Sequence, residues 1–348
     1  MPADRALSRR DVLQLAVGWG GAAAAAPLLT ACGLDPSAVR LDDVPTPSPP
    51  VPGPDDLARF AAVGRVTALR NQATSLAGSS AGDPADSTSP VATLGAAFAL
   101  DHEAHLAQLG PLPGPVPSGS PTPPGWPEPA PTDPADSAEP VTAALLSAAE
   151  QAGAADLLSR TAEVSGPLAR LLASVATACA ARAFALAAAA GAPAPDAVLP
   201  PAPPPPAAHA PDLQGRASLQ ALLVAHTAAR YGYGVLAVRL TDAERDRATA
   251  ALARHDVDAG SLTAAASEAG IDLIAPAPAF SLPPLADAAA ARALAARLEL
   301  DVADAAAAVV VAPEDWLRSL GIAHLVPAGL GAAGWGALPA FPGLPEHA

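Results

Sequence analysis

Three proline-rich tracts constrain this chain more than any other feature of its sequence. They run over residues 44–54, 111–140 and 192–211, and the third contains four consecutive prolines from Pro203 to Pro206. Proline lacks a backbone N–H and clashes with the preceding helical turn, so such runs favour extended conformations and cannot continue a helix. The tracts therefore divide the chain into segments that must fold between them.

The segments between the tracts are rich in Ala, Leu and Arg, and their apolar residues have helical spacing. None alternates strictly with a period of two, so the sequence offers no strong strand candidate. The predicted helices cover residues 55–79, 92–110, 141–161, 166–190, 215–240, 242–269, 286–312 and 314–334.

Each half of the chain thus contains four predicted helices, with its longest connection in the middle. These connections are residues 111–140 in the first half and residues 276–284 in the second. One long crossover in a four-helix bundle is the connectivity of ferritin-like proteins. The predicted fold is therefore all-α, with tandem ferritin-like four-helix bundles joined by proline-rich linkers. The predicted organisation is a signal over 1–31, a tether over 32–54, a bundle over 55–190, a linker over 191–214 and a bundle over 215–348.

The N-terminal segment indicates where the protein is located. Arg9 and Arg10 precede a Gly- and Ala-rich apolar run, which resembles a twin-arginine export signal, although Val12 is a weak match to its large apolar residue. The run ends in Leu29-Thr30-Ala31-Cys32, which resembles a bacterial lipobox. This resemblance implies cleavage before Cys32 and a lipid on Cys32 that inserts into the outer face of the cell membrane. Two alternatives remain: an uncleaved anchor helix, and export by the general secretory route.

Composition argues against a nucleic-acid partner and against a disulfide as a source of stability. The net charge is -15 and the chain has no lysine, so it lacks the clustered basic side chains that bind a nucleic-acid backbone. Cys32 and Cys179 are the only cysteines, and a lipidated Cys32 cannot form a disulfide. Cys179 shares an apolar helical stripe with Leu168, Leu171 and Val175, which predicts a buried free thiol.

Several motifs in the second half carry a family resemblance. Residues 225–235 (AHTAARYGYGV), 277–283 (APAFSLP) and 340–346 (AFPGLPE) resemble an uncharacterised ferritin-like domain family of bacterial, largely lipoprotein, chains. The match covers roughly residues 219–346. The resemblance implies a fold and a location, and it implies no established reaction.

The sequence argues against a ferritin-type iron centre. Such a centre needs Glu from two helices and Glu-x-x-His from the other two, and no Glu-x-x-His occurs in this chain. Ala225 stands where the family usually has Glu before His226, and Cys179 and Arg182 stand at the corresponding level of the first half. No catalytic centre is recognisable, and no cofactor is expected from these positions.

A different set of polar residues is a candidate metal site. His226 and His255 lie on inward stripes at nearly equal distances from the turn near Thr241, while Glu299 and His324 lie about one turn apart in level. Three imidazoles and a carboxylate would suit zinc or another divalent ion. The alternative, favoured because helix offsets err by two residues or more, is that these are separate polar residues, with Glu299 on a solvent-facing flank.

A second histidine pair lies in the first half of the chain. His102 and His105 are three residues apart, which places them on one helix face, beside Asp101 and Glu103. The favoured interpretation is a solvated helix face rather than a metal site.

The main functional hypothesis is a non-catalytic structural or binding module that presents helix faces to a protein partner at the cell surface. The alternative is a divalent-metal-binding protein or metalloenzyme.

Overall fold

The computed structural model describes residues 52–79, 89–110, 140–196 and 211–344. Arg9, Arg10 and Cys32 lie outside the described residues, as do large parts of the three proline-rich tracts. The described residues belong to one compact unit.

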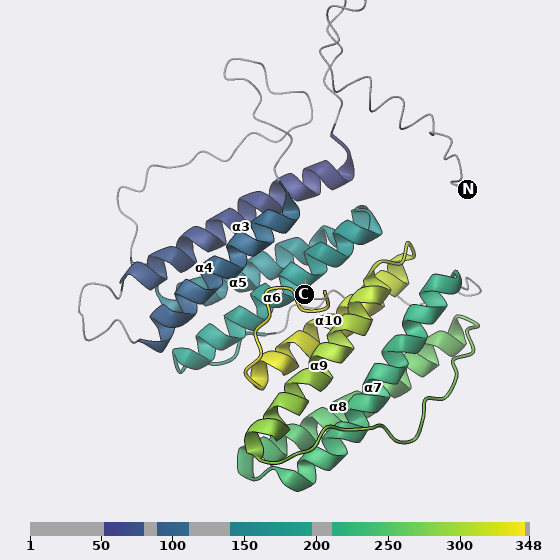
Figure 1. Ribbon diagram of the computed structural model, residues 1–348. Coiled ribbons are helices and arrows are strands. Elements are labelled where there is room, and N and C mark those ends of the chain that lie inside the picture. The colour runs from purple at the N-terminus through teal and green to yellow at the C-terminus, as the bar shows by residue number, and fades with distance from the viewer. Residues whose placement is uncertain (1–51, 80–88, 111–139, 197–210, 345–348) are drawn as a thin grey trace, which may run out of the picture. The chain divides into compact units, whose positions relative to one another are not determined.

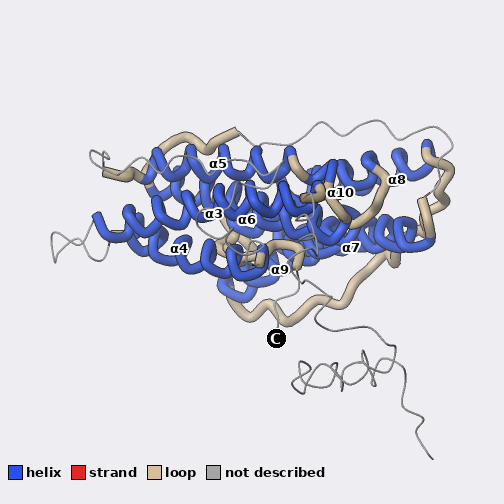
Figure 2. Tube along the Cα trace, turned by 90° about the horizontal axis from the view of Figure 1, so that it is seen from above, coloured by secondary structure: helices blue, strands red, loops and turns tan. Residues whose placement is uncertain are grey.

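Regular structure in these described ranges is entirely helical (Figures 1 and 2). The α-helices are α3 (Pro54–Ser79), α4 (Pro90–Leu109), α5 (Ala143–Ser159), α6 (Gly166–Ala189), α7 (Leu213–Arg239), α8 (Asp242–Glu268), α9 (Ala288–Val310) and α10 (Asp315–Gly334), with a short 3₁₀ helix, η3 (Thr161–Glu163). The all-α prediction is confirmed, and each predicted helix end lies within two residues of an observed one.

The helices begin where local chemistry satisfies their free N–H groups. The carboxylate of Asp212 accepts a hydrogen bond from the backbone N–H of Gly215 at the start of α7 (2.7 Å), and Asp287 does the same at the start of α9. Pro54 begins α3 and Pro90 begins α4, in the first turn where a missing N–H costs nothing. Prolines and short polar caps therefore set the boundaries that the sequence indicates.

Consecutive helices pack as pairs: α3 with α4, α5 with α6, α7 with α8, and α9 with α10. Further contacts join α3 to α5, α4 to α6, and α7 to α9. The extended segment 271–287 connects α8 to α9 along the outside of α7, where Ile274 exchanges two hydrogen bonds with Gln220 (Figure 1). This is the long middle connection that the sequence predicts for the second half.

The two halves pack against each other through α6, which contacts α9 and α10. A Cβ added at Gly166 would collide with the carbonyl of Val311, and one at Gly329 would collide with Thr177, so these glycines permit the close approach. The guanidinium of Arg318 in α10 donates hydrogen bonds to the carbonyls of Thr161, Ala162 and Val164 between α5 and α6. The sequence left the packing of the halves open.

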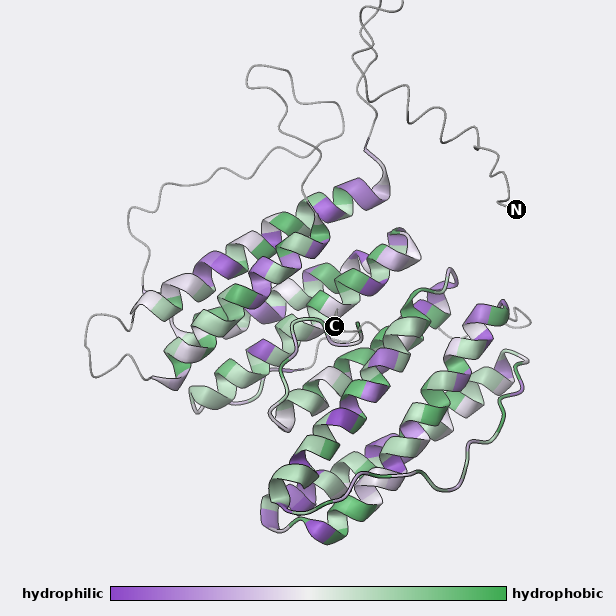
Figure 3. Cartoon of the chain, viewed as in Figure 1, coloured by the Kyte–Doolittle hydropathy of each residue, from purple (hydrophilic) through white to green (hydrophobic). Residues whose placement is uncertain are grey.

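Small residues make much of the core. Many of the buried hydrophobic residues are alanines. Every helix carries both hydrophobic and hydrophilic residues (Figure 3), and one large buried cluster extends over both halves. Of the described helices only α6 is long and apolar enough to cross a membrane, yet 72% of its most apolar window is buried inside the protein. Its composition is therefore accounted for by its central position in the core.

Candidate metal centre

The four predicted ligand residues converge, one from each helix of the second half. His226 lies on α7, His255 on α8, Glu299 on α9 and His324 on α10, and none is more than 7% exposed. The favoured interpretation of separate residues with Glu299 on a solvent-facing flank is therefore wrong. The error lay in the expected width of the buried face of α9, because Leu298 is buried as expected and Glu299 beside it is buried as well.

His226 is the centre of a chain of three imidazoles. Its Nδ1 lies 3.0 Å from Nδ1 of His255, and its Nε2 lies 3.0 Å from Nδ1 of His324. Burial, reinforced by His324, His255 and the charge of Arg254, lowers the pKa of His226 to about 2. Burial also lowers the pKa of His324. Both rings are therefore neutral at physiological pH, which is the form that binds metals.

Glu299 is fully engaged by protein groups. Nη2 of Arg254 lies 2.5 Å and 2.6 Å from its two carboxylate oxygens, and the Tyr233 hydroxyl donates to Oε1 at 2.7 Å. Burial alone would raise the pKa of Glu299, but the hydrogen bond with His255, the charge of Arg254 and the Tyr233 hydrogen bond outweigh it and lower that pKa. The Glu299 carboxylate is thus a paired anion rather than a free ligand.

Sequence reasoning missed Arg254, Tyr233 and Asp258. Arg254 Nη2 also lies 3.1 Å from Nε2 of His255, so a guanidinium nitrogen sits between the Glu299 carboxylate and an imidazole, where the predicted ligand set would place an ion. Trp335 Nε1 donates to the Tyr233 hydroxyl at 2.9 Å and fixes its position. Only the spacing of His255 and Asp258, three residues apart and hence on one helix face, was readable in advance.

Asp258 changes the candidate ligand set. Its Oδ2 lies 3.9 Å from Nδ1 of His226. One nitrogen each from His226 and His324 and one oxygen from Asp258 lie within 4.8 Å of one another. Among the described residues this is the one group of three or more histidine, cysteine or acidic side chains with that geometry.

The polar residues of the first half form a different arrangement. His102 and His105 are both fully buried, so the solvated-face interpretation is wrong. His102 Nε2 hydrogen-bonds Oε1 of Glu150 at 2.7 Å, and His105 Nε2 donates to the carbonyl of Ala340 at 2.7 Å. The segment after α10, far along the chain, therefore covers the α4 face that sequence reasoning left to solvent.

Cys179 is a buried free thiol, as predicted. Burial and the neighbouring Glu150 raise the pKa of the Cys179 thiol well above its usual value, so it stays protonated. Arg182 is also buried, and its Nη2 lies 2.9 Å from Asp101 while its guanidinium lies 5.5 Å from the ring centroid of Phe98. A protonated thiol and a fixed cation are poor surroundings for a divalent ion.

Comparison with known proteins gives one match. The model of a family described as "Domain of unknown function (DUF4439)" matches residues 218–346, which begin in α7 and run past the end of α10. Neither the curated proteins nor the solved structures contain a match to the chain. The second half, which holds the imidazole chain, thus resembles an uncharacterised domain family.

Proposed function

We propose that this protein is a lipid-anchored extracytoplasmic protein whose second half binds one divalent ion, zinc in the first instance, through His226, His324 and Asp258. The observation that carries the proposal is the convergence of these three side chains within 4.8 Å, with both histidines buried. The packing of α7 to α10, with one long connection between the second and third helices, supports a ferritin-like bundle as the scaffold.

The chemistry of this ligand set favours zinc over iron. Two neutral imidazoles and one carboxylate are ligands that zinc accepts, and tetrahedral zinc ligands stand roughly 3.3 Å apart. Asp258 is partly exposed, so its side chain has room to move toward the imidazoles. The buried carboxylate of Glu299 is held by Arg254 and Tyr233 and does not complete a two-metal carboxylate site.

His255 has a positioning role in this proposal. It lies between Glu299 (3.4 Å from Nε2 to Oε1) and His226 (3.0 Å between the Nδ1 atoms). A carboxylate behind a histidine fixes the orientation and tautomer of that ring, and through it those of the next ring. The proposed role of the site is ion binding.

The purified protein is expected to retain one zinc ion per chain after dialysis against a weak chelator, and no stoichiometric iron. Asp258→Asn is expected to weaken zinc binding at least about tenfold, because it removes the only anionic ligand of the three. Asp256→Asn is a matched control two residues away on α8, since Asp256 is exposed and pairs with Arg230. Elemental analysis and competition titration with Zn²⁺ measure both. Equal affinities in the two variants, or no zinc at all, would contradict the proposal.

The proposed location has its own test. Cys32→Ala is expected to leave most of the protein unprocessed or released from the membrane fraction, because the lipid attaches through that sulfur. Fractionation followed by mass spectrometry of the mature N-terminus measures this. A variant that is processed and sediments with membranes as the parent protein does would disprove lipid anchoring. A protein partner at the cell surface stays a prediction from the sequence.

A further inference from the structure

A hollow of about 330 Å³ opens beside Glu299, and none of the metal-binding residues proposed above lines it. Side chains of α6, α8, α9 and α10 line it, with Phe184, Leu330 and Trp335 as apolar walls and Arg247 and Arg254 as charged ones. The volume lies at the small end of the range of known ligand sites, roughly 300–1,000 Å³.

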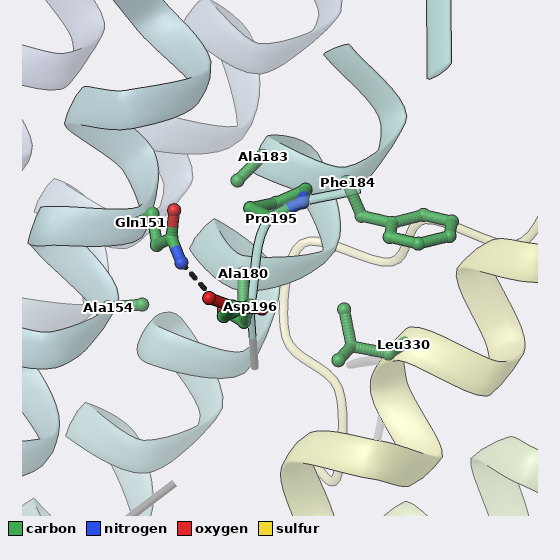
Figure 4. A pocket seen from close by; sticks show the side chains of 8 residues that line it. All are labelled: Gln151, Ala154, Ala180, Ala183, Phe184, Pro195, Asp196 and Leu330. Atoms are coloured by element: carbon green, nitrogen blue, oxygen red, sulfur yellow. Dashed lines mark hydrogen bonds between the residues drawn. The ribbon is translucent and has the colours of Figure 1, made fainter. Parts of the chain in front are cut away.

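This hollow differs from its neighbour. The smaller one, around the hydrogen bond from Gln151 to the carbonyl of Asp196, measures about 20 Å³ and has room for one water molecule (Figure 4). Phe184 and Leu330 line both spaces, so these two side chains stand between them. Only the larger space accommodates an organic molecule.

Small residues on α8 create one wall of the larger hollow. Arg247 and Arg254 are seven residues apart and so share one face of α8, with Ala250 and Ala251 between them. The two alanines leave the space between the guanidinium groups unfilled. This face of α8 therefore carries one guanidinium group at each end, with the two alanines between them.

Two glycines on α10 create the opposite wall. A Cβ at Gly331 would lie 2.5 Å from the carboxylate carbon of Glu299, so glycine is required there for the carboxylate to fit. A Cβ at Gly334 would meet nothing within 4 Å, so no packing contact explains that glycine. Gly334 is itself one of the residues that line the hollow.

The charges around the hollow leave one cation uncompensated. Arg254 is paired with Glu299. Arg247 has no acidic partner among the described residues; its Nη1 donates to the carbonyl of Gly334, and its guanidinium lies 5.1 Å from the ring centroid of Trp335. In a chain with a net charge of -15, this is a local positive site beside aromatic and aliphatic walls.

We propose that the hollow binds a small organic acid. Its anionic group would pair with Arg247 and the outer edge of Arg254, and its apolar body would lie against Phe184, Leu330 and Trp335. Charge selects the anion, and the apolar walls select a ligand with a hydrocarbon or aromatic body over an inorganic ion. The site shares no proposed metal ligand, so it stands or falls independently of zinc binding.

The probe for this site is 4-phenylbutyrate, which carries one carboxylate on an apolar body of suitable size, with 4-phenyl-1-butanol as its uncharged counterpart. Calorimetric titration of the full chain is expected to give a dissociation constant of about 1 mM or tighter for the acid. The alcohol is expected to bind at least about tenfold more weakly. Equal binding of acid and alcohol, or no binding of the acid, would overturn the proposal.

Variants locate the binding site. Gly334→Leu places a side chain into the open space and is expected to weaken binding of the acid at least about tenfold, and Arg247→Gln is expected to do the same. Gly260→Leu is the matched control for the first, because Gly260 on α8 is exposed and also has nothing within 4 Å. Arg297→Gln, at an exposed position of α9, is the control for the second. Binding that survives both hollow variants, or is lost equally in the controls, refutes the assignment.

Discussion

Lowering the pH from about 7.5 to about 5.5 is expected to reduce the free energy of unfolding by about 3 kcal/mol through His226 and His105 alone. Burial lowers the pKa of His226 to about 2, and burial together with Arg182 lowers the pKa of His105 well below its usual value. Both stay neutral in the folded protein over this range, whereas in the unfolded chain they bind protons as the pH falls through about 6.5.

The sign follows from proton binding. A group that binds more protons when unfolded makes stability rise with pH, so these histidines stabilise the fold above about pH 6.5, and that stability is lost on acidification. Each contributes roughly 1–2 kcal/mol over the interval, and His324, whose pKa is also lowered, adds to the loss. The lowered pKa of Glu299 acts in a separate, more acidic window, because an unfolded glutamate titrates near about 4.3.

Urea unfolding at about pH 7.5, 6.5 and 5.5, with a chelator present, measures this loss. His226→Gln removes one of the titrating groups and serves as the comparison. That variant is expected to be less stable than the parent protein at neutral pH but to lose roughly 1–2 kcal/mol less on acidification. A free energy of unfolding that is flat across the interval would show that the buried histidines become protonated without unfolding.

The helices were predictable because their signals are local. Apolar spacing, the prolines at the starts of α3 and α4, and the caps Asp212 and Asp287 act within one or two turns, so each end could be placed from a short window. The meeting of His226 and His255 was predictable for a related reason. The turn between α7 and α8 is only two residues long, so counting back and forward from it gives the level of each side chain.

The chemistry around Glu299 was not predictable in this way. Whether Arg254 reaches inward depends on the position of α9 relative to α8, which the sequence of α8 does not contain. The burial of His105 depends on two residues after α10. The carbonyl of Ala340 accepts its hydrogen bond, and the ring centroid of Phe341 lies 4.9 Å from its own. Such contacts between distant segments are decided by tertiary packing, and helical periodicity carries no information on them.

Arg318→Met is expected to reduce the free energy of unfolding by about 3–5 kcal/mol. The Arg318 side chain is 6% exposed, and its Nη1 lies 2.7 Å from the carbonyl of Thr161 and 3.0 Å from that of Val164. Its Nη2 donates to the carbonyl of Ala312 between α9 and α10. Methionine fills part of the same volume but leaves these buried carbonyls without donors, and an unsatisfied buried polar group costs about 1–3 kcal/mol.

Arg297→Met is the control, because Arg297 is exposed on α9 and pairs with Asp301 one turn away. A change within about 0.5 kcal/mol is expected for it. Urea unfolding followed by far-ultraviolet circular dichroism compares the two variants with the parent protein.

Because Arg318 connects the loop between α5 and α6 to α10, its loss is expected to separate one cooperative transition into two, one for each half. If Arg318→Met unfolds in a single transition at the parent's midpoint, the hydrogen bonds of Arg318 add no net stability and are not what couples the folding of the two halves.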